Sequence, residues 1–175
     1  PVVSRTPDGS TAGLNTATPT TPAESGTLAD GQAKIQSGDL LGGRQVLNDL
    51  ILSGKLSPAD VTAARKAIAQ ANQTLIFSGK RFPGDPFGGT YVVKPGDNLA
   101  KIAQNYDITW ELLARINGLN DPRKLRAGAT LKVLKGPFHA VVTKSAYTMD
   151  LYLGSPDEKG SMYITTYRVG LGRED

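Results

Sequence analysis

The side chains that most often carry out catalysis are scarce in this 175-residue chain, which has no cysteine and one histidine, His139. The absence of cysteine excludes thiolate nucleophiles, disulfide bonds, Cys-x-x-Cys zinc sites and iron–sulfur ligation within these residues. One histidine cannot build a histidine-rich metal site, and neither a Gly-x-Ser-x-Gly motif nor a patterned partner completes a triad around it. No motif marks a catalytic pair of carboxylates. We therefore predict no catalytic residue, metal site or cofactor in this sequence.

Residues 90–134 have the spacing of a small mixed module. Tyr91–Val93 are β-forming residues followed by a proline and a glycine, and Asp97 or Asn98 is a good N-cap for the helix after them. A second cap at Thr109 opens another helix, whose apolar residues recur every three positions. An Asn-Gly pair ends that helix before a second β-forming segment. The order β-α-α-β allows the two strands to pair antiparallel over a small core.

This segment resembles the lysin motif (LysM) family, with two departures: Asn98 stands where Thr or Ser is usual, and Leu134 where proline is expected. LysM modules bind glycans that contain N-acetylglucosamine, so the resemblance implies peptidoglycan or a chitin-like glycan as partner. The matching residues are Tyr91-Val92-Val93, Pro95-Gly96-Asp97, Leu99, Ile102-Ala103, Tyr106, Leu113, Asn117-Gly118-Leu119, Leu125, Gly128 and Leu131.

The resemblance also implies where a sugar chain would bind, namely between the first strand–helix connection and the second helix–strand connection. The implied glycan-binding residues are Gly96, Asp97, Asn98 and Leu99 on one side, and Ile116, Asn117, Leu119, Asn120 and Asp121 on the other. The alternative for the polar residues is helix capping, and for the apolar ones a place in the core. Trp110 is expected in the core or at the groove rim rather than as a stacking platform.

Basic residues gather beside this expected groove. We expect Arg123, Lys124, Arg126 and Lys132 to form a solvated face, with electrostatic steering of stem-peptide carboxylates or wall phosphates as the alternative. Residues 90–134 hold seven of the basic and four of the acidic side chains, which is three of the chain's net charges of +4. Nucleic acid is a poor fit as a partner, because no aromatic residues are interleaved with the basic ones and no recognition-helix pattern carries them.

The first half of the chain shows no chemistry of its own. Residues 1–26 are rich in Thr and Pro and are predicted to be a disordered tether. Residues 27–79 carry helical stripes, such as Val61, Ala64 and Ile68, and predict a tetratricopeptide-like helical hairpin that acts as a spacer or docks a protein partner. Residues 80–89 are a Pro/Gly-rich linker, which Phe82 and Phe87 could pack against a neighbouring domain.

The last segment, residues 137–175, alternates apolar and polar residues and predicts three short strands. It resembles the opening strands of an L,D-transpeptidase catalytic domain, a family that crosslinks peptidoglycan stem peptides through a cysteine thioacyl-enzyme. The resemblance places that cysteine beyond residue 175 and assigns His139 a strand position. We expect no second layer over the apolar face of this sheet, which should make it the most weakly packed ordered part. The residues that carry the resemblance are Pro137–Ser145, Met149–Leu153 and Tyr167–Gly172.

The sequence as a whole therefore predicts an α+β protein with a disordered N-terminal tail, an α-helical hairpin, a βααβ LysM module and a partial antiparallel β-sheet at the C-terminus. Glycine and proline number 20 and 11, which favours a mosaic of segments over one compact core. No apolar run is long enough to span a membrane. The leading functional hypothesis is a glycan-binding module that targets a wall enzyme at the cell envelope. The alternatives are part of an L,D-transpeptidase and a protein-docking helical hairpin.

Overall fold

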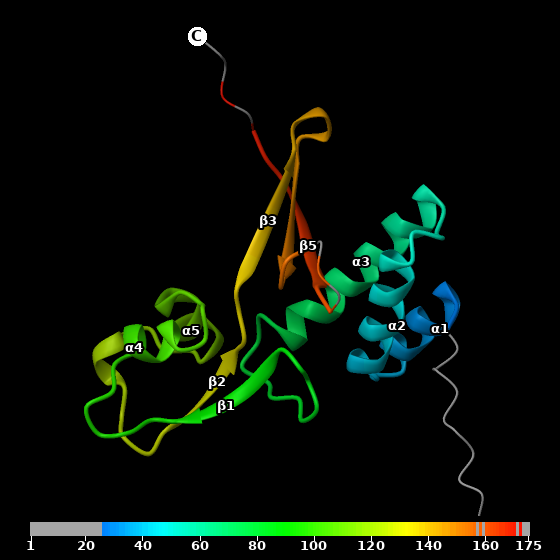
Figure 1. The fold of residues 1–175 in the computed structure, drawn as a ribbon. Coiled ribbons are helices and arrows are strands. Elements are labelled where there is room, and N and C mark those ends of the chain that lie inside the picture. Colours follow the sequence, from blue (N-terminus) through cyan, green and yellow to red (C-terminus); the bar gives the residue numbers. More distant parts are fainter. Residues whose placement is uncertain (1–25, 157, 159, 171, 173–175) are drawn as a thin grey trace, which may run out of the picture.

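The computed structural model describes residues 26–156, 158, 160–170 and 172, so all but the last residue of the predicted tether at residues 1–26 lies outside the described residues. The described chain is a mixed α+β protein with antiparallel sheets, as the sequence predicts (Figure 1). None of its described helices is long and apolar enough to cross a membrane. The elements are α1 (Leu28–Gln36), α2 (Leu40–Leu52), α3 (Pro58–Leu75), β1 (Gly88–Val92), α4 (Leu99–Gln104), α5 (Trp110–Ile116), η1 (Pro122–Lys124), β2 (Thr130–Leu134), β3 (Phe138–Thr143), η2 (Lys144–Ala146), β4 (Thr148–Leu153) and β5 (Met162–Arg168).

Each of the first three helices begins at a side-chain cap. Thr27 and Asp30 form a reciprocal capping box on α1, and Asp39 accepts a hydrogen bond from Gly42 N–H on α2. Ser57 caps α3, where proline occupies the first helical position. These local signals determine where the three helices start within the predicted helical region of residues 27–79.

The βααβ module forms around the pairing of β1 with β2. The strands are antiparallel, with Gly88 opposite Leu134 and Val92 opposite Thr130. Asn98 and Thr109 cap α4 and α5, and the Leu119 N–H bonds to the Ala114 carbonyl to close α5. The core beneath the helices consists of Val93, Leu99, Ile102, Ala103, Leu113, Ala114, Leu131 and Val133.

The three predicted C-terminal strands form one antiparallel sheet in the order β3-β4-β5, with an irregularity between Leu151 and Tyr152. The expectation that nothing in the chain covers this sheet is wrong. Tyr163 of β5 packs with Leu47, Ala64 and Ile68, so the apolar stripe of the helices and the base of the sheet bury each other. The other end of the sheet extends beyond the helices, and Val142 and Tyr167 are exposed there (Figure 1).

Buried asparagines fix the helices to the sheet. Asn48 of α2 accepts a hydrogen bond from Tyr163 N–H and donates one to the Ser161 carbonyl. Asn72 of α3 donates to the carbonyls of Tyr163 and Ile164. These bonds join both helices to backbone groups at the start of β5, so α2 and α3 act as a second layer with a defined position.

A central core joins the three segments and overturns the prediction of a mosaic. Its buried members come from α3 and the residue directly after it, from the βααβ module and from the C-terminal sheet. They are Ala71, Leu75, Ile76, Ile116, Leu134, Leu153, Met162 and Ile164. Because one apolar cluster contains side chains of all three segments, the module is held against the rest of the chain instead of swinging on a linker.

The predicted linker is itself ordered and packed. Phe82 and Phe87 lie against the central core, which confirms the expectation that they anchor this stretch. Asp85 is buried and forms an ion pair with Arg44 of α2 at 2.6 Å. Strand β1 begins at Gly88, within the predicted linker of residues 80–89, because Gly88 and Gly89 pair with Leu134 and Val133.

Candidate functional site

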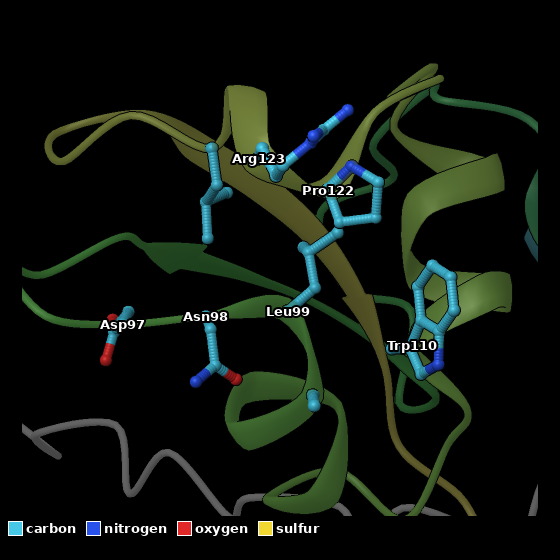
Figure 2. Close-up of a pocket in the computed structure, with 8 residues that line it drawn as sticks. Asp97, Asn98, Leu99, Trp110, Pro122 and Arg123 are labelled. Carbon is cyan, nitrogen blue, oxygen red and sulfur yellow. The ribbon is translucent and has the colours of Figure 1, made fainter.

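An open groove of about 540 Å³ lies on the βααβ module between two connections of the chain. One wall comes from the β1–α4 connection and the start of α4, and the other from η1 and the residue after it (Figure 2). Trp110 stands at the end of the groove, at the start of α5. The lining residues are Asp97, Asn98, Leu99, Ala100, Trp110, Pro122, Arg123 and Leu125.

The first wall is held in shape by Asp97. Its carboxylate accepts hydrogen bonds from the Tyr91 hydroxyl at 2.7 Å and from Lys94 N–H at 2.8 Å. The hydrogen bond from Tyr91 and then the one from Lys94 keep the pKa of the Asp97 carboxyl below its ordinary value, so it stays ionised at neutral pH. Gly96 precedes it at a φ of 84°, which favours glycine. The connection is thus preformed in the unbound chain.

Asn98 and Leu99 have dual roles. The Asn98 Oδ1 caps α4 by accepting from Lys101 N–H at 2.9 Å, yet the residue is exposed at the groove. Leu99 is buried in the module core and also lines the groove, where it points toward Pro122 (Figure 2). The structure therefore brings Asp97, Asn98 and Leu99 together at one site, next to Gly96.

The residues implied on the second side are distributed differently. Ile116 is 1% exposed and belongs to the central core. The Asn117 amide donates to the carbonyls of Leu113 and Lys132 and accepts from Lys132 N–H at 2.7 Å, so it ties α5 to β2. These two side chains do not line the groove.

The remaining residues of this connection support the second wall. Leu119 packs on the module core, and Asn120 is exposed but does not line the groove. Asp121 caps η1 by accepting from Arg123 N–H and Nε, so it positions Arg123 at the groove without lining it. The hydrogen bond from the Arg123 side chain, then that from its N–H, lowers the pKa of the Asp121 carboxyl.

The structure decides between the two positions that the sequence left open for Trp110, the core and the groove rim. The chain's single tryptophan is 41% exposed and lines the groove, so it lies at the rim and not in the core. Trp110 is the first residue of α5, directly after the Thr109 cap, and this position at the helix end leaves it exposed although Leu113 and Ile116, spaced three residues apart after it, are buried.

One of the four residues predicted to form a solvated basic face, Lys132, is buried in the structure. Lys132 is 3% exposed, and its Nζ donates to the carbonyls of Leu75 at 2.6 Å and Ser78 at 2.7 Å. Leu75 is the last residue of α3, where helices leave carbonyl acceptors unpaired, and Ser78 follows shortly after it in the chain. The prediction of a surface position for Lys132 is therefore wrong: the residue joins the βααβ module to α3. Arg123, Lys124 and Arg126 remain exposed.

The groove offers the groups that a sugar recognises. Leu99, Ala100, Pro122 and Leu125 give it an apolar floor, and the exposed indole of Trp110 adds an aromatic surface. Asn98 and Arg123 supply polar groups at the edge, and the first N–H groups of α4 have no partner within the helix. Apolar walls with a few placed polar groups suit the hydroxyl, acetamido and methyl groups of an N-acetylated sugar.

Comparison with known families agrees with this architecture. A family model described as LysM domain matches residues 91–134. This confirms the LysM resemblance for that segment, and the βααβ module is called the LysM module below. LysM modules bind N-acetylglucosamine-containing glycans and are typically extracellular or associated with cell walls.

Other comparisons add little. No curated protein matches the chain. One solved structure, a MoCVNH3 variant (Mo0v) in complex with (N-GlcNAc)4, matches at 16% identity and a TM-score of 0.28. That match covers 46% of this chain and 54% of the other, so it spans about half the length of the solved chain. At this TM-score we draw no argument from it.

Proposed function

We propose that this chain binds peptidoglycan or a chitin-like glycan through its single LysM module and holds a wall enzyme on that polymer at the cell envelope. The observation that carries the proposal is the groove of about 540 Å³ between the two connections of the module that matches the LysM family. Asp97, Asn98 and Leu99 on one wall, and Pro122, Arg123 and Leu125 on the other, would contact the sugar chain. Gly96, Asn117 and Asp121 would support these walls.

The proposal makes Trp110 a sugar-contacting residue. Replacing Trp110 with alanine should reduce retention of the chain on insoluble peptidoglycan or chitin by about tenfold, because an exposed aromatic surface at the groove is lost. The measurement is a pulldown with increasing amounts of polymer. The matched control is Tyr167→Ala, which removes an exposed aromatic ring far along the C-terminal sheet. Equal retention of the two variants, or no retention of the unaltered chain, would refute the proposal.

A second proposal concerns the C-terminal sheet, whose uncovered end carries the aligned residues Val142, Met149 and Tyr167. We propose that it forms the start of an L,D-transpeptidase sheet, with the catalytic cysteine beyond residue 175. The described strands contain no cysteine and would act as scaffold. Reading the coding sequence past Asp175 tests this, since it should encode a Ser/Thr-His-Gly-Cys motif, and its absence would remove the proposal.

A protein-docking role for the helical hairpin of residues 27–79 is less favoured, because β5 already occupies the apolar face of α2 and α3.

A further inference from the structure

A second hollow adjoins the groove on the far side of Trp110. It is lined by Ala100, Ala103, Gln104, Asp107, Ile108, Thr109, Trp110 and Glu111 and has a volume of about 460 Å³. Ala100 and Trp110 line both hollows, so the two are neighbours and the indole lies where they meet. A polymer that leaves the groove past Trp110 would therefore enter this second hollow.

The second hollow is built from a fixed turn. The Asp107 and Ile108 N–H groups bond to the carbonyls of Gln104 and Ala103, and Asp107 has a φ of 52°. Gly136 packs directly on the backbone of this turn, where a Cβ would overlap the Asp107 carbonyl, and its N–H bonds to the Tyr106 carbonyl. The turn is thus held by the chain that leads into β3, and its shape exists before any ligand binds. A preformed surface reduces the entropy that binding must overcome.

The two hollows differ in charge. Asp107 and Glu111 bring two carboxylates to the second hollow, Gln104 adds an amide, and no basic side chain is among its lining residues, whereas the groove is lined by both the Asp97 carboxylate and Arg123. Carboxylates accept hydrogen bonds from sugar hydroxyls, and the amide both donates and accepts them, but the carboxylates repel an anionic substituent. The second hollow therefore suits a neutral sugar unit.

We propose that the hollow beyond Trp110 is an additional subsite for a neutral sugar unit of the same glycan chain, continuous with the groove. The proposal rests on the proposed glycan-binding function of that groove. Trp110 would contact sugars on both sides, and Gln104 and Glu111 would bind only the unit that lies beyond it. The groove alone would then be filled by a short oligosaccharide, and a longer one would gain affinity by reaching the second hollow.

Calorimetric titration of the chain with N-acetylglucosamine oligomers of increasing length tests this subsite. Affinity should rise by about tenfold once the oligomer extends past Trp110. In the double variant Gln104→Ala/Glu111→Ala that rise should disappear, while affinity for the short oligomers stays unchanged. Arg115→Ala, which alters an exposed residue of α5 outside both hollows, is the matched control and should keep the rise. A long oligomer can also gain affinity because it has more positions in which it can bind the groove. This statistical gain is the same for the unaltered chain and both variants, so it cannot explain a difference between them in the rise of affinity with length.

The outcomes separate the subsite from the proposed function. If the double variant binds long oligomers as tightly as the unaltered chain, or if affinity does not depend on length, the subsite is overturned and the groove stands. If no oligomer of any length binds, the proposed function fails, and the subsite fails with it.

Discussion

Replacing Arg44 with methionine is expected to lower the free energy of unfolding by about 3–5 kcal/mol. Arg44 is 2% exposed, and its Nη2 donates to the Asp85 carboxylate at 2.6 Å. Its guanidinium also lies over the Phe87 ring, 5.7 Å from the centroid. Methionine fills similar space but leaves the Asp85 carboxylate, which is 7% exposed, buried without its cationic partner. The cost therefore arises mainly from the unpaired charge.

Two further variants isolate this effect in chemical denaturation. The double variant Arg44→Met/Asp85→Asn should recover much of the lost stability, because the asparagine oxygen can still accept the Phe87 N–H bond that Asp85 accepts at 3.1 Å. Lys34→Met breaks an ion pair with Asp39 in which both side chains are about half exposed, so it should change the free energy of unfolding far less than Arg44→Met does. A loss for Arg44→Met as small as that for Lys34→Met would contradict a structural role for the buried pair.

Replacing Lys132 with methionine should lower the free energy of unfolding by about 2–4 kcal/mol, measured in the same way. The reason is that the carbonyls of Leu75 and Ser78 lose a buried, charged donor at the end of α3. Methionine retains the apolar part of the side chain, so the loss reports these hydrogen bonds and not a cavity. Lys135→Met, at an exposed position near the end of β2, is the control and should change stability little.

Lys132 also gives stability a specific dependence on pH. Burial lowers the pKa of its amine from the ordinary value of 10.5 to about 8. Between these two values the unfolded chain binds more protons than the folded chain, so the Lys132 contribution to the free energy of unfolding rises with pH across that window. Below about pH 8 both states are protonated, and this contribution no longer changes with pH. The rise should be absent in Lys132→Met, and identical pH profiles for the two proteins would show that Lys132 is not buried as described.

The elements were predictable because their signals are local. Caps such as Asn98 and Thr109 mark helix starts whatever surrounds them. The strands of the C-terminal sheet follow from alternation alone, and the order β-α-α-β follows from the spacing between residues 90 and 134. Such local signals do not show which helix face packs on which sheet face, so the packing of α2 and α3 on β5 could not be predicted.

Lys132 shows why packing between segments escaped prediction. It lies between Leu131 and Val133 in β2, and alternation with a lysine at that place indicates a solvent-facing side chain. In the structure, the end of α3 covers that face of the strand and offers carbonyls to the amine. The buried surroundings of Lys132 exist only because residues far apart in the sequence contact each other in the fold. The same reason explains how a Pro/Gly-rich stretch became an ordered segment anchored by Asp85.

The candidate site was predicted in part for a related reason. The resemblance gave the two connections, and Asp97, Asn98 and Leu99 do meet at the groove. It could not say that the Asn117 amide would be occupied by Lys132 backbone groups, or that Ile116 would enter a core shared with the C-terminal sheet. The sequence left Trp110 between the core and the groove rim, because its spacing from Leu113 suits a buried face while its place at the first turn of α5 suits an exposed one.

The most direct test of the central claim, glycan binding in this groove, is a nuclear magnetic resonance titration of the chain with an N-acetylglucosamine tetramer. The backbone amide signals of residues 97–100, the Trp110 indole signal and the amide signals of residues 123–125 should shift together and saturate with one affinity. Signals of α2 and β4, which lie away from the groove, should stay in place. Shifts that are absent, or that centre on residues outside the groove, would contradict the account.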